Sequence, residues 1–198
     1  EIAKYECIYV TEKIFATITQ VTNPQGRMAI IEKNDKNKEI DFTQDIIVAL
    51  DDVQDPGNLG TILRTVDSIG LNQIIVSKGT ADAFNAKVVR STMGAIFRIN
   101  IIEVEDLKQS IKEMKKHHFK LMVTSLQTDN SIYDIDFNKK IIVIGNESNG
   151  VSQEIQDMAD EKAKIPMLGK TESLNASVAA GIVMYEYVRQ KLSNKKHI

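Results

Sequence analysis

The chain has 198 residues, of which 42% are hydrophobic and 26% are charged, and its formal net charge is −2. This length predicts one folded domain with an appendage, and the hydrophobic fraction is large enough for a substantial core. The slightly negative charge excludes the global positive field of many nucleic-acid-binding proteins, so any affinity for nucleic acid must come from local basic patches.

Cysteine and histidine usage excludes two kinds of site. Cys7 is the only cysteine, so no disulfide forms within the chain. The three histidines, His117, His118 and His197, do not have the spacing of a zinc motif, and we expect no metal. No apolar run reaches the length of a membrane span and the first residues do not resemble a signal peptide, which predicts a soluble cytoplasmic protein without a membrane partner.

Residues 1–33 do not look like a complete folding unit. Their pattern predicts a helix over Glu12–Thr19, a turn at Asn23–Gly26 and a strand over Met28–Glu32. A fragment of this size cannot bury a core of its own, so we interpret it as the remnant of a longer N-terminal domain; the alternative is a short native extension. Residues 34–45 are polar and charged and are predicted to be a linker.

Residues 46–198 are predicted to form the main domain, because apolar runs alternate there with helical patterns. The apolar runs are mostly β-branched and continuous, as strands buried on both faces are. They occur at Ile46–Leu50, Gln73–Ser77, Phe97–Ile102, Leu121–Ser125, Ile141–Gly145 and Lys164–Pro166. The predicted helices cover Leu59–Ile69, Asn85–Met93, Glu105–His118, Gln153–Asp160 and Leu174–Leu192. This alternation predicts an α/β fold with a mainly parallel sheet and helices on both faces.

Three polar stretches interrupt this pattern, and the first is DDVQDPGNLGTILRTVDSIG at residues 51–70. Asp55-Pro56-Gly57 is a typical turn sequence that leads from a strand into a helix, and Asn58 is a plausible cap of that helix. Arg64, on the same helix, has a planar guanidinium that can clamp a phosphate with two hydrogen bonds. The alternative is a surface arginine paired with an acidic neighbour, Asp67 or Asp52.

The second stretch, IIVIGNESNGVS, covers residues 141–152. Gly145 and Gly150 have the spacing of a phosphate-binding loop, but that loop needs a lysine after its second glycine, and Val151 stands there. No GxGxxG pattern of a dinucleotide-binding site occurs either. What remains is a turn with close backbone approach and the carboxylate of Glu147, which alternatively caps the following helix or is solvated.

The third stretch, IPMLGKTESLNASVAAGI, covers residues 165–182. A polar loop over Gly169–Ser173 leads into a helix whose first turns, Asn175–Gly181, consist almost entirely of small residues. The loop offers free backbone groups, and the start of a helix has unsatisfied N–H donors. These features predict the seat of a polar ligand beside a closely packed helix; the alternative is an ordinary connection between a strand and a helix.

Together the three stretches resemble the signature motifs of the SpoU/TrmH branch of the SPOUT superfamily, the RNA ribose 2′-O-methyltransferases. They match, in family order, a D-P-x-N-x-G-x-x-x-R-T run, a G-x-E-x-x-G run and a P-M-x-G-x-x-x-S-L-N-x-S-V-A run. The resemblance covers residues 46–191 and implies a SPOUT-type fold with a C-terminal trefoil knot, which general rules of topology would not suggest. Residues 1–33 are similar to the last part of a substrate-binding domain that many SpoU-type enzymes carry.

The resemblance also implies a site for S-adenosylmethionine and a set of residues at the reacting centre. An apolar slot that binds adenine through main-chain groups suits a mostly neutral ring. The implied cofactor-binding residues are Thr124, Ser125, Leu126, Gly145, Ile165, Met167 and Leu174. The implied catalytic residues are Asn58, Arg64, Glu147, Ser173 and Asn175.

Arg64 and Arg90 are the residues that we assign to RNA. Arg90, in KVVRSTMG, sits where relatives have a similar stretch. No histidine lies near the motifs to take the proton of a ribose 2′-hydroxyl, and Arg64 is the family's favoured candidate, although free arginine has a pKa above about 12. Two roles stay open for Arg64: positioning of a phosphate and the 2′-hydroxyl, or an unusual base helped by the RNA phosphate.

The sequence therefore predicts an S-adenosylmethionine-dependent RNA 2′-O-ribose methyltransferase. Ribosomal RNA is the first expected substrate, because of the N-terminal similarity, and transfer RNA is the alternative. A non-catalytic RNA-binding protein with the same fold is a further alternative, which the loss of a motif residue would have favoured. The helix over Leu174–Leu192 is apolar nearly all round, so we expect a homodimer through this helix and the helix of the first motif, as in relatives.

Overall fold

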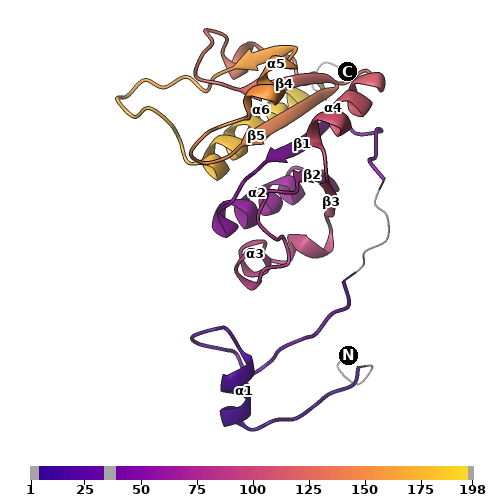
Figure 1. The fold of residues 1–198 in the computed structure, drawn as a ribbon, viewed down its shortest axis with the longest axis vertical. Coiled ribbons are helices and arrows are strands. Elements are labelled where there is room, and N and C mark those ends of the chain that lie inside the picture. Colours follow the sequence, from indigo (N-terminus) through magenta and orange to yellow (C-terminus); the bar gives the residue numbers. More distant parts are fainter. Residues whose placement is uncertain (1–4, 34–38, 196–198) are drawn as a thin grey trace. The chain divides into compact units, whose positions relative to one another are not determined.

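The computed structural model describes residues 5–33 and 39–195 (Figure 1). His197 and part of the predicted linker lie outside the described residues. The chain divides into two units, residues 1–36 and residues 37–198, and we call the second unit the main domain.

The first unit contains one short helix and little else. Helix α1 (Glu12–Ile18) begins at Thr11, whose hydroxyl accepts a hydrogen bond from the backbone N–H of Ile14. The prediction of a strand over Met28–Glu32 is wrong, because that segment is irregular and exposed. No described side chain of this unit is buried, and an apolar segment without a neighbouring strand does not form a sheet.

The main domain is built on one parallel sheet, which confirms the predicted fold class. Its six strands follow the order β3-β2-β1-β5-β4-β6, and every neighbouring pair is parallel. The strands are β1 (Ile46–Asp51), β2 (Gln73–Ser77), β3 (Asn100–Val104), β4 (Lys120–Thr124), β5 (Lys140–Gly145) and β6 (Glu161–Ala163). The two central strands, β1 and β5, are buried along their whole length, as their continuous apolar sequence predicts.

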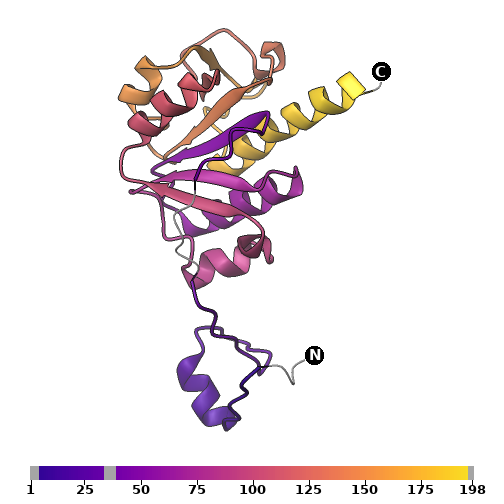
Figure 2. The same cartoon turned by 90° about the vertical axis from the view of Figure 1, so that its right-hand side faces the viewer.

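Helices cover both faces of this sheet. They are α2 (Pro56–Ser68), α3 (Ala86–Ser91), α4 (Leu107–Lys116), α5 (Gln153–Asp157) and α6 (Ala176–Lys195), with 3-10 turns η2 (Ala95–Phe97) and η3 (Ile132–Asp134). One apolar core joins α2, α3 and α6 to alternate residues of β1, such as Val48. A second core joins α4 and α5 to the intervening residues, such as Ile47 (Figure 2). The domain therefore has three layers.

The order of the strands determines where a ligand can bind. The chain builds β1, β2 and β3 outward in one direction and then crosses back to β4, so that β5 lies beside β1. In open parallel sheets such a reversal leaves a crevice at the carboxyl ends of the two central strands. The loops that follow β1 and β5 belong to the first and second motifs, so both motifs meet at this position.

A polar cluster at the opposite, amino-terminal end of the sheet holds the last helix in place. The Tyr187 hydroxyl donates to Asp45 Oδ2 at 3.1 Å, and Lys191 Nζ lies 2.9 Å from the same oxygen and 2.7 Å from the Tyr187 hydroxyl. The hydrogen bond from Lys191 lowers the pKa of Asp45, and burial raises the pKa of Tyr187. We call Asp45, Tyr187 and Lys191 the amino-end triad.

One detail of the sequence prediction differs at the edge of the sheet. The last strand was expected over Lys164–Pro166, but β6 covers Glu161–Ala163, and only Lys164 adds an isolated bridge to Ser131. The trefoil knot stays a prediction. None of the helices in the described part of the chain is long and apolar enough to cross a membrane.

Candidate functional site

Helix α2 begins three residues before its first leucine, Leu59, and this start organises the site. Asp55 is the N-cap, because its Oδ1 accepts a hydrogen bond from the backbone N–H of Asn58 at 2.8 Å. Pro56 occupies the first helical position, where its missing N–H is not needed. The prediction that Asn58 caps this helix is therefore wrong, and its side chain is free for other partners.

The side chain of Asn58 joins the three sequence motifs. Its Nδ2 donates to Glu147 Oε1 at 2.9 Å, and its Oδ1 accepts from Asn175 Nδ2 at 2.9 Å. Asn58 is 8% exposed, whereas Glu147 and Asn175 are exposed, so these bonds lie at the boundary between the core and the surface. We call Asn58, Glu147 and Asn175 the carboxyl-end cluster. Three residues that the family resemblance implied separately thus lie in direct contact.

The direction of these hydrogen bonds is fixed by the start of α6. Asn175 Oδ1 accepts from Ser177 N at 3.0 Å and from the Ser177 hydroxyl at 2.7 Å, which makes Asn175 the cap of α6. Its Nδ2 must then be the donor to Asn58, and Asn58 Nδ2 must be the donor to the Glu147 carboxylate. Each amide therefore donates toward the second motif: Asn175 donates to Asn58, and Asn58 donates to Glu147.

Glu147 is the point at which this chain of hydrogen bonds ends. Besides Asn58, its two oxygens accept the backbone N–H groups of Gln54 and Asp55, both at 3.1 Å. Burial raises the pKa of this carboxyl, but the hydrogen bonds from Asn58, Gln54 and Asp55, with one from its own backbone, outweigh burial and hold the pKa below its ordinary value. Glu147 therefore stays ionised and ties the loop after β5 to the start of α2. The alternative that it caps the next helix is wrong.

The glycines of the second motif serve the shape of the loop. A Cβ on Gly145 would overlap the backbone of Gly150 and Val151, so the end of β5 can pass this close only as glycine. Gly150 has φ +70°, a value that favours glycine. Asn146 closes the loop, because its Oδ1 accepts from Ser148 N at 2.9 Å and its Nδ2 donates to the Asp52 carbonyl at 2.9 Å. This geometry explains the spacing without a bound phosphate.

The predicted cofactor-binding residues lie at the ends of three neighbouring strands. Thr124 ends β4, Gly145 ends β5, and Ile165 and Met167 follow β6. Ser125 N donates to the Ala163 carbonyl at 3.0 Å and so fastens the segment after β4 to β6. The side chains of Thr124, Ser125, Ile165, Met167 and Leu174 are half-buried, while Leu126 is exposed. These residues form one region of the sheet edge, next to the carboxyl-end cluster.

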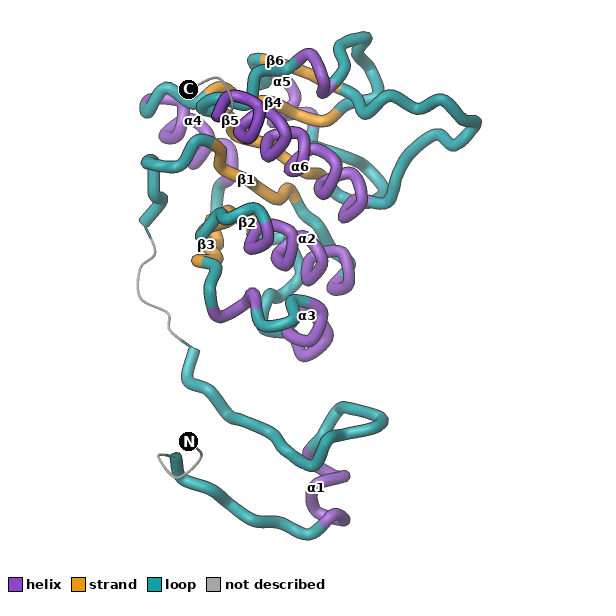
Figure 3. The backbone as a smooth tube through the Cα atoms, turned by 180° about the vertical axis from the view of Figure 1, so that it is seen from behind, coloured by secondary structure: helices purple, strands orange, loops and turns teal. Residues whose placement is uncertain are grey.

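The loop between β6 and α6 meets the requirements of an adenine site. Between Ile165 and Leu174, no backbone group forms a hydrogen bond with another described residue. The loop projects from the main domain (Figure 3), and Leu168 on it is fully exposed. Unpaired N–H and C=O groups beside half-buried apolar side chains are what a flat, mostly neutral ring needs. These residues fit S-adenosylmethionine.

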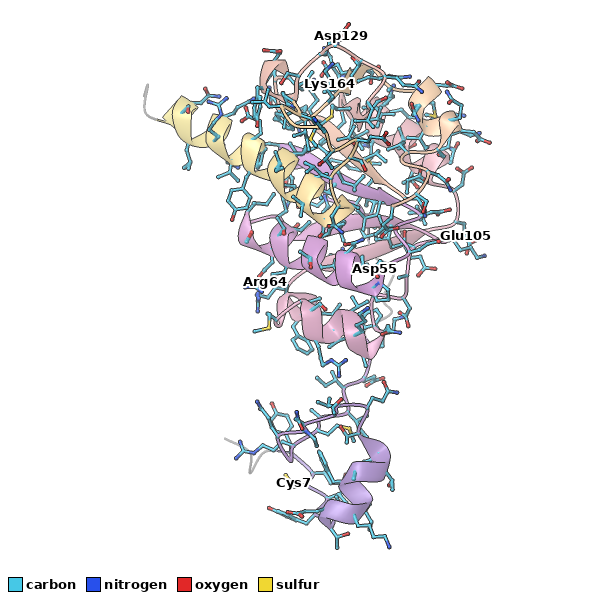
Figure 4. All side chains as sticks on the ribbon, turned by 90° about the vertical axis from the view of Figure 1, so that its left-hand side faces the viewer. Cys7, Asp55, Arg64, Glu105, Asp129 and Lys164 are labelled. Atoms are coloured by element: carbon cyan, nitrogen blue, oxygen red, sulfur yellow. The ribbon has the colours of Figure 1, made fainter. Side chains whose placement is uncertain are left out.

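Arg64 differs from the cluster in being exposed and unpaired. It lies six residues after Asn58, so its side chain points away from a different side of α2 (Figure 4). No ion pair or hydrogen bond joins its guanidinium to any described residue. The two acidic partners suggested by the sequence are occupied: Asp67 binds Arg98, and Asp52 accepts from the Ser77 hydroxyl.

The remaining predicted residues are separate from the cluster. Ser173 is exposed on the loop before α6 and makes no hydrogen bond with the described residues, and Arg90 is exposed on α3. Sequence reasoning missed two residues that shape the site, Asp55 and Asn146. The signal for Asp55 was available, because an acidic residue directly before proline is a typical helix start. Nothing in the sequence indicated the contact between Asn146 and the loop after β1.

Comparison with known proteins agrees with this geometry. The family model described as the SpoU rRNA Methylase family matches residues 45–185. The chain is 34% identical over 181 residues to the 23S rRNA (guanosine(2553)-2′-O)-methyltransferase RlmP of Bacillus subtilis, covering 91% of this chain and 71% of that protein. It is 36% identical over 149 residues to the 23S rRNA (guanosine-2′-O-)-methyltransferase RlmB of Xylella fastidiosa, covering 75% and 60%.

A solved structure is similar along most of the chain. The AdoMet-bound rRNA methyltransferase from Sinorhizobium meliloti is 33% identical, with a TM-score of 0.77 over 91% of this chain and 70% of that one. All of these proteins are longer than the segment that the chain matches. The sequence motifs, the strand order and the matched family model lead to the same assignment: this chain belongs to the SpoU rRNA methylase family.

Proposed function

We propose that the protein transfers a methyl group from S-adenosylmethionine to a ribose 2′-hydroxyl of RNA. The observation that carries the proposal is the carboxyl-end cluster, because it connects all three family motifs through side-chain hydrogen bonds at the switch point of the sheet. Support also comes from relatives that are named rRNA 2′-O-methyltransferases.

Residues at the ends of β4, β5 and β6 would hold the cofactor. Ile165, Met167 and Leu174 supply apolar contacts, and the unpaired backbone groups of their loop supply hydrogen bonds to the adenine. S-adenosylmethionine, when bound, supplies an electrophilic methyl group on a sulfonium. The chain's task is then to align the ribose oxygen with that methyl group, which can account for much of the rate.

Arg64 is the residue that we assign to the RNA at the reacting centre. It is exposed and has no partner among the described residues, so its guanidinium is available for a phosphate and a 2′-hydroxyl. Glu147 is a poor candidate for the base, because its oxygens are occupied and its pKa is held low. We propose that Glu147 and Asn58 position the loop and helix that carry Arg64. Arg64 would orient the 2′-hydroxyl and the adjacent RNA phosphate, and the hydroxyl proton would pass to that phosphate or to water as the oxygen takes the methyl group.

Ribosomal RNA is the substrate that we favour, since the family and the curated relatives above are named for it. An enzyme acting on this substrate meets it in the cytoplasm. Transfer RNA is the second candidate. A non-catalytic RNA-binding role is disfavoured, because Asn58, Arg64, Glu147 and Asn175 are all present, and three of them are connected.

We also propose a homodimer through α6 and α2. Val178, Tyr185 and Leu192 are each at least half exposed, and their spacing of seven residues puts them in one stripe along α6. Gly181 has open space where a Cβ would point, so another backbone can approach there. The Tyr185 hydroxyl lies 3.3 Å from the Ser68 hydroxyl, which places this stripe beside the end of α2. A second copy covering the stripe would come close to Arg64.

We propose that residues 1–33 add to RNA binding, as part of a substrate-binding domain. The apolar residues Ile8, Tyr9 and Ile30 are more than 80% exposed there, and the segment contributes Lys13 and Arg27. Removal of residues 1–36 should therefore weaken binding to ribosomal RNA in a filter-binding assay while S-adenosylmethionine binding is unchanged. Equal RNA affinity of both chains at matched salt would contradict this role.

The central test combines ligand binding with methyl transfer. S-adenosylmethionine and its demethylated product should each raise the melting temperature. At a hundredfold excess of ligand over its Kd, the free energy of unfolding should increase by about 2.7 kcal/mol. ATP should not. Tritium from labelled methyl groups should then appear in ribosomal RNA from cells that lack the gene, and nuclease digestion should release it as 2′-O-methyl nucleoside. Stabilisation by ATP alone, or label on a base, would reject the proposal.

A further inference from the structure

Helices α2 and α3 form a continuous surface next to the candidate site. They run in the same direction: a Cβ on Gly57 would lie 4.0 Å from Lys87 Cε, and a Cβ on Gly60 would overlap Ser91. Gly60 thus lets the two helices touch. Arg64 lies one helical turn beyond Gly60 on the same side of α2, so it falls beside the turn that follows Ser91.

That turn presents two large apolar side chains to solvent. Met93 is 70% exposed and Phe97 is 67% exposed. Met93 has φ +50°, an unfavourable conformation for this residue, and it is followed by Gly94 at φ +88°. Thr92 directly before it is completely buried and donates to the Val89 carbonyl at 2.7 Å. The fold therefore holds Met93 outward at some conformational cost, as often occurs at functional sites.

The surface is also held rigid against α2. Arg98, next to Phe97, binds Asp67 of α2 through two nitrogens, with Nη2 2.7 Å from Oδ2. An exposed aromatic ring on a fixed backbone loses little freedom when it binds a partner, which favours affinity.

Unpaired arginines identify the kind of partner. Four arginines lie in the main domain, and two of them, Arg98 and Arg189, form two-nitrogen ion pairs with acidic residues. The other two, Arg64 and Arg90, have no such partner among the described residues, and both belong to the α2–α3 pair. Lys87 on α3 is likewise exposed without a described partner. In a chain of net charge −2, this is a local concentration of free cations.

We infer that the surface formed by Lys87, Arg90, Met93 and Phe97 binds a single-stranded RNA segment that flanks the methylated nucleotide. Unstacked bases bind by stacking on exposed aromatic and apolar side chains, while arginine and lysine contact the phosphates between them. Duplex RNA exposes its bases too little to use Phe97 in this way. The inference rests on the proposed function and extends it from the reacting nucleotide to the next nucleotides of the strand.

Two kinds of variant separate stacking from charge. The probes are a fluorescein-labelled single-stranded RNA of about 12 nucleotides and mixed sequence, and a duplex RNA of the same length. The Kd for each is measured by fluorescence anisotropy at several salt concentrations between about 50 and 200 mM. The double variant Met93→Asn with Phe97→Gln keeps a residue that tolerates positive φ at position 93. It should weaken single-strand binding about tenfold with an unchanged salt slope. Arg90→Gln should instead lower the salt slope by about 0.7.

Matched controls lie on other elements. Tyr133→Gln removes an aromatic ring that is 54% exposed on η3, and Lys112→Gln removes an exposed lysine on α4. Neither control should change single-strand affinity or its salt slope.

Three results would overturn the inference. The first is wild-type affinity of the double variant for the single strand. The second is an equal loss for single strand and duplex. The third is dissociation of an oligomer by the double variant in sedimentation, which would make this surface a protein interface. Failure of the proposed function is distinguishable, since it would appear as absent methyl transfer by the wild-type chain.

Discussion

The two ends of the sheet carry polar clusters that look alike and differ in one respect. The amino-end triad contains an anion, a cation and a phenol, and every member binds both of the others. The carboxyl-end cluster contains one carboxylate and two amides, and Arg64, an unpaired cation on the same helix as Asn58, is left outside it. A closed cluster can only fasten α6. An open one, with a free arginine and an unpaired backbone loop beside it, can also receive a ligand.

The largest effect should come from Arg64, which this comparison makes a functional residue without a structural role. Arg64→Ala should lower methyl transfer about 10²- to 10⁴-fold, while the melting temperature and S-adenosylmethionine affinity stay near wild type. Arg64→Lys should not restore activity, because an ammonium lacks the planar fork. Single-turnover methyl transfer and calorimetric binding would measure both. Near wild-type transfer by the lysine variant would refute the assigned role.

A second test concerns the exposed stripe of α6, which neither cluster uses. Tyr185→Asp places a charge on a side chain that is 53% exposed, so the fold of one chain should not change. The proposed dimer should nevertheless dissociate at least tenfold more readily, since each copy would bury an unpaired charge at the interface. Activity should fall with it. Tyr133→Asp, at a similar exposure on η3, is the control. Sedimentation of the active wild-type chain as a monomer at micromolar concentration would exclude the dimer.

A third test uses pH to sharpen the comparison at Glu147. Its folded-state pKa lies below the ordinary value, so its stabilising contribution is complete above about pH 5.5 and is lost as pH falls through the folded pKa. Wild type should exceed Glu147→Gln in stability by about 1 kcal/mol at pH 6, and the gap should close as pH falls through the lowered pKa of the folded state. Glu172→Gln, on the exposed loop, controls for loss of charge. A gap that does not change with pH would mean that the carboxylate charge is unimportant.

The smallest effect is expected at the amino-end triad. Lys191→Met removes an ion pair whose two side chains are about half exposed, so the free energy of unfolding should fall by only about 0.5–1 kcal/mol. Asp45 and Tyr187 keep their own hydrogen bond. Methyl transfer should be unchanged in an assay at 25 °C. A large loss of activity without a loss of stability would show that this end of the sheet also acts in function.

The sequence predicted strand positions best where helices cover both faces of the sheet. The strand Gln73–Ser77 was predicted with the bounds that the structure has, because a continuous β-branched run suits a strand covered on both faces. The last strand was misplaced, because β6 reads Glu-Lys-Ala and lies at an edge with one neighbour, where polar residues are tolerated. Apolar pattern carries little information at such an edge.

For the site, the motif residues could be named from the sequence, but their connections could not. The preference of asparagine for the start of a helix predicted Asn58 as the cap. In the structure Asp55 is the cap, and the Asn58 amide binds Glu147 and Asn175 instead. Pairings across most of a domain depend on strand order, and strand order has no local signal. The freedom of Arg64 was equally invisible, because it depends on Arg98 occupying Asp67.

The span of those pairings has a consequence for how the protein is made. The two hydrogen bonds of Asn58 reach 89 and 117 residues along the chain, so neither can form until most of the domain has left the ribosome. During that time the central strand β1, the earliest of the sheet to be synthesised, has one edge open, because its neighbour β5 follows only after β2, β3 and β4. Distant pairings fold slowly, and open apolar strand edges promote aggregation. Production of this protein should therefore depend on chaperones and temperature more than its final stability would suggest.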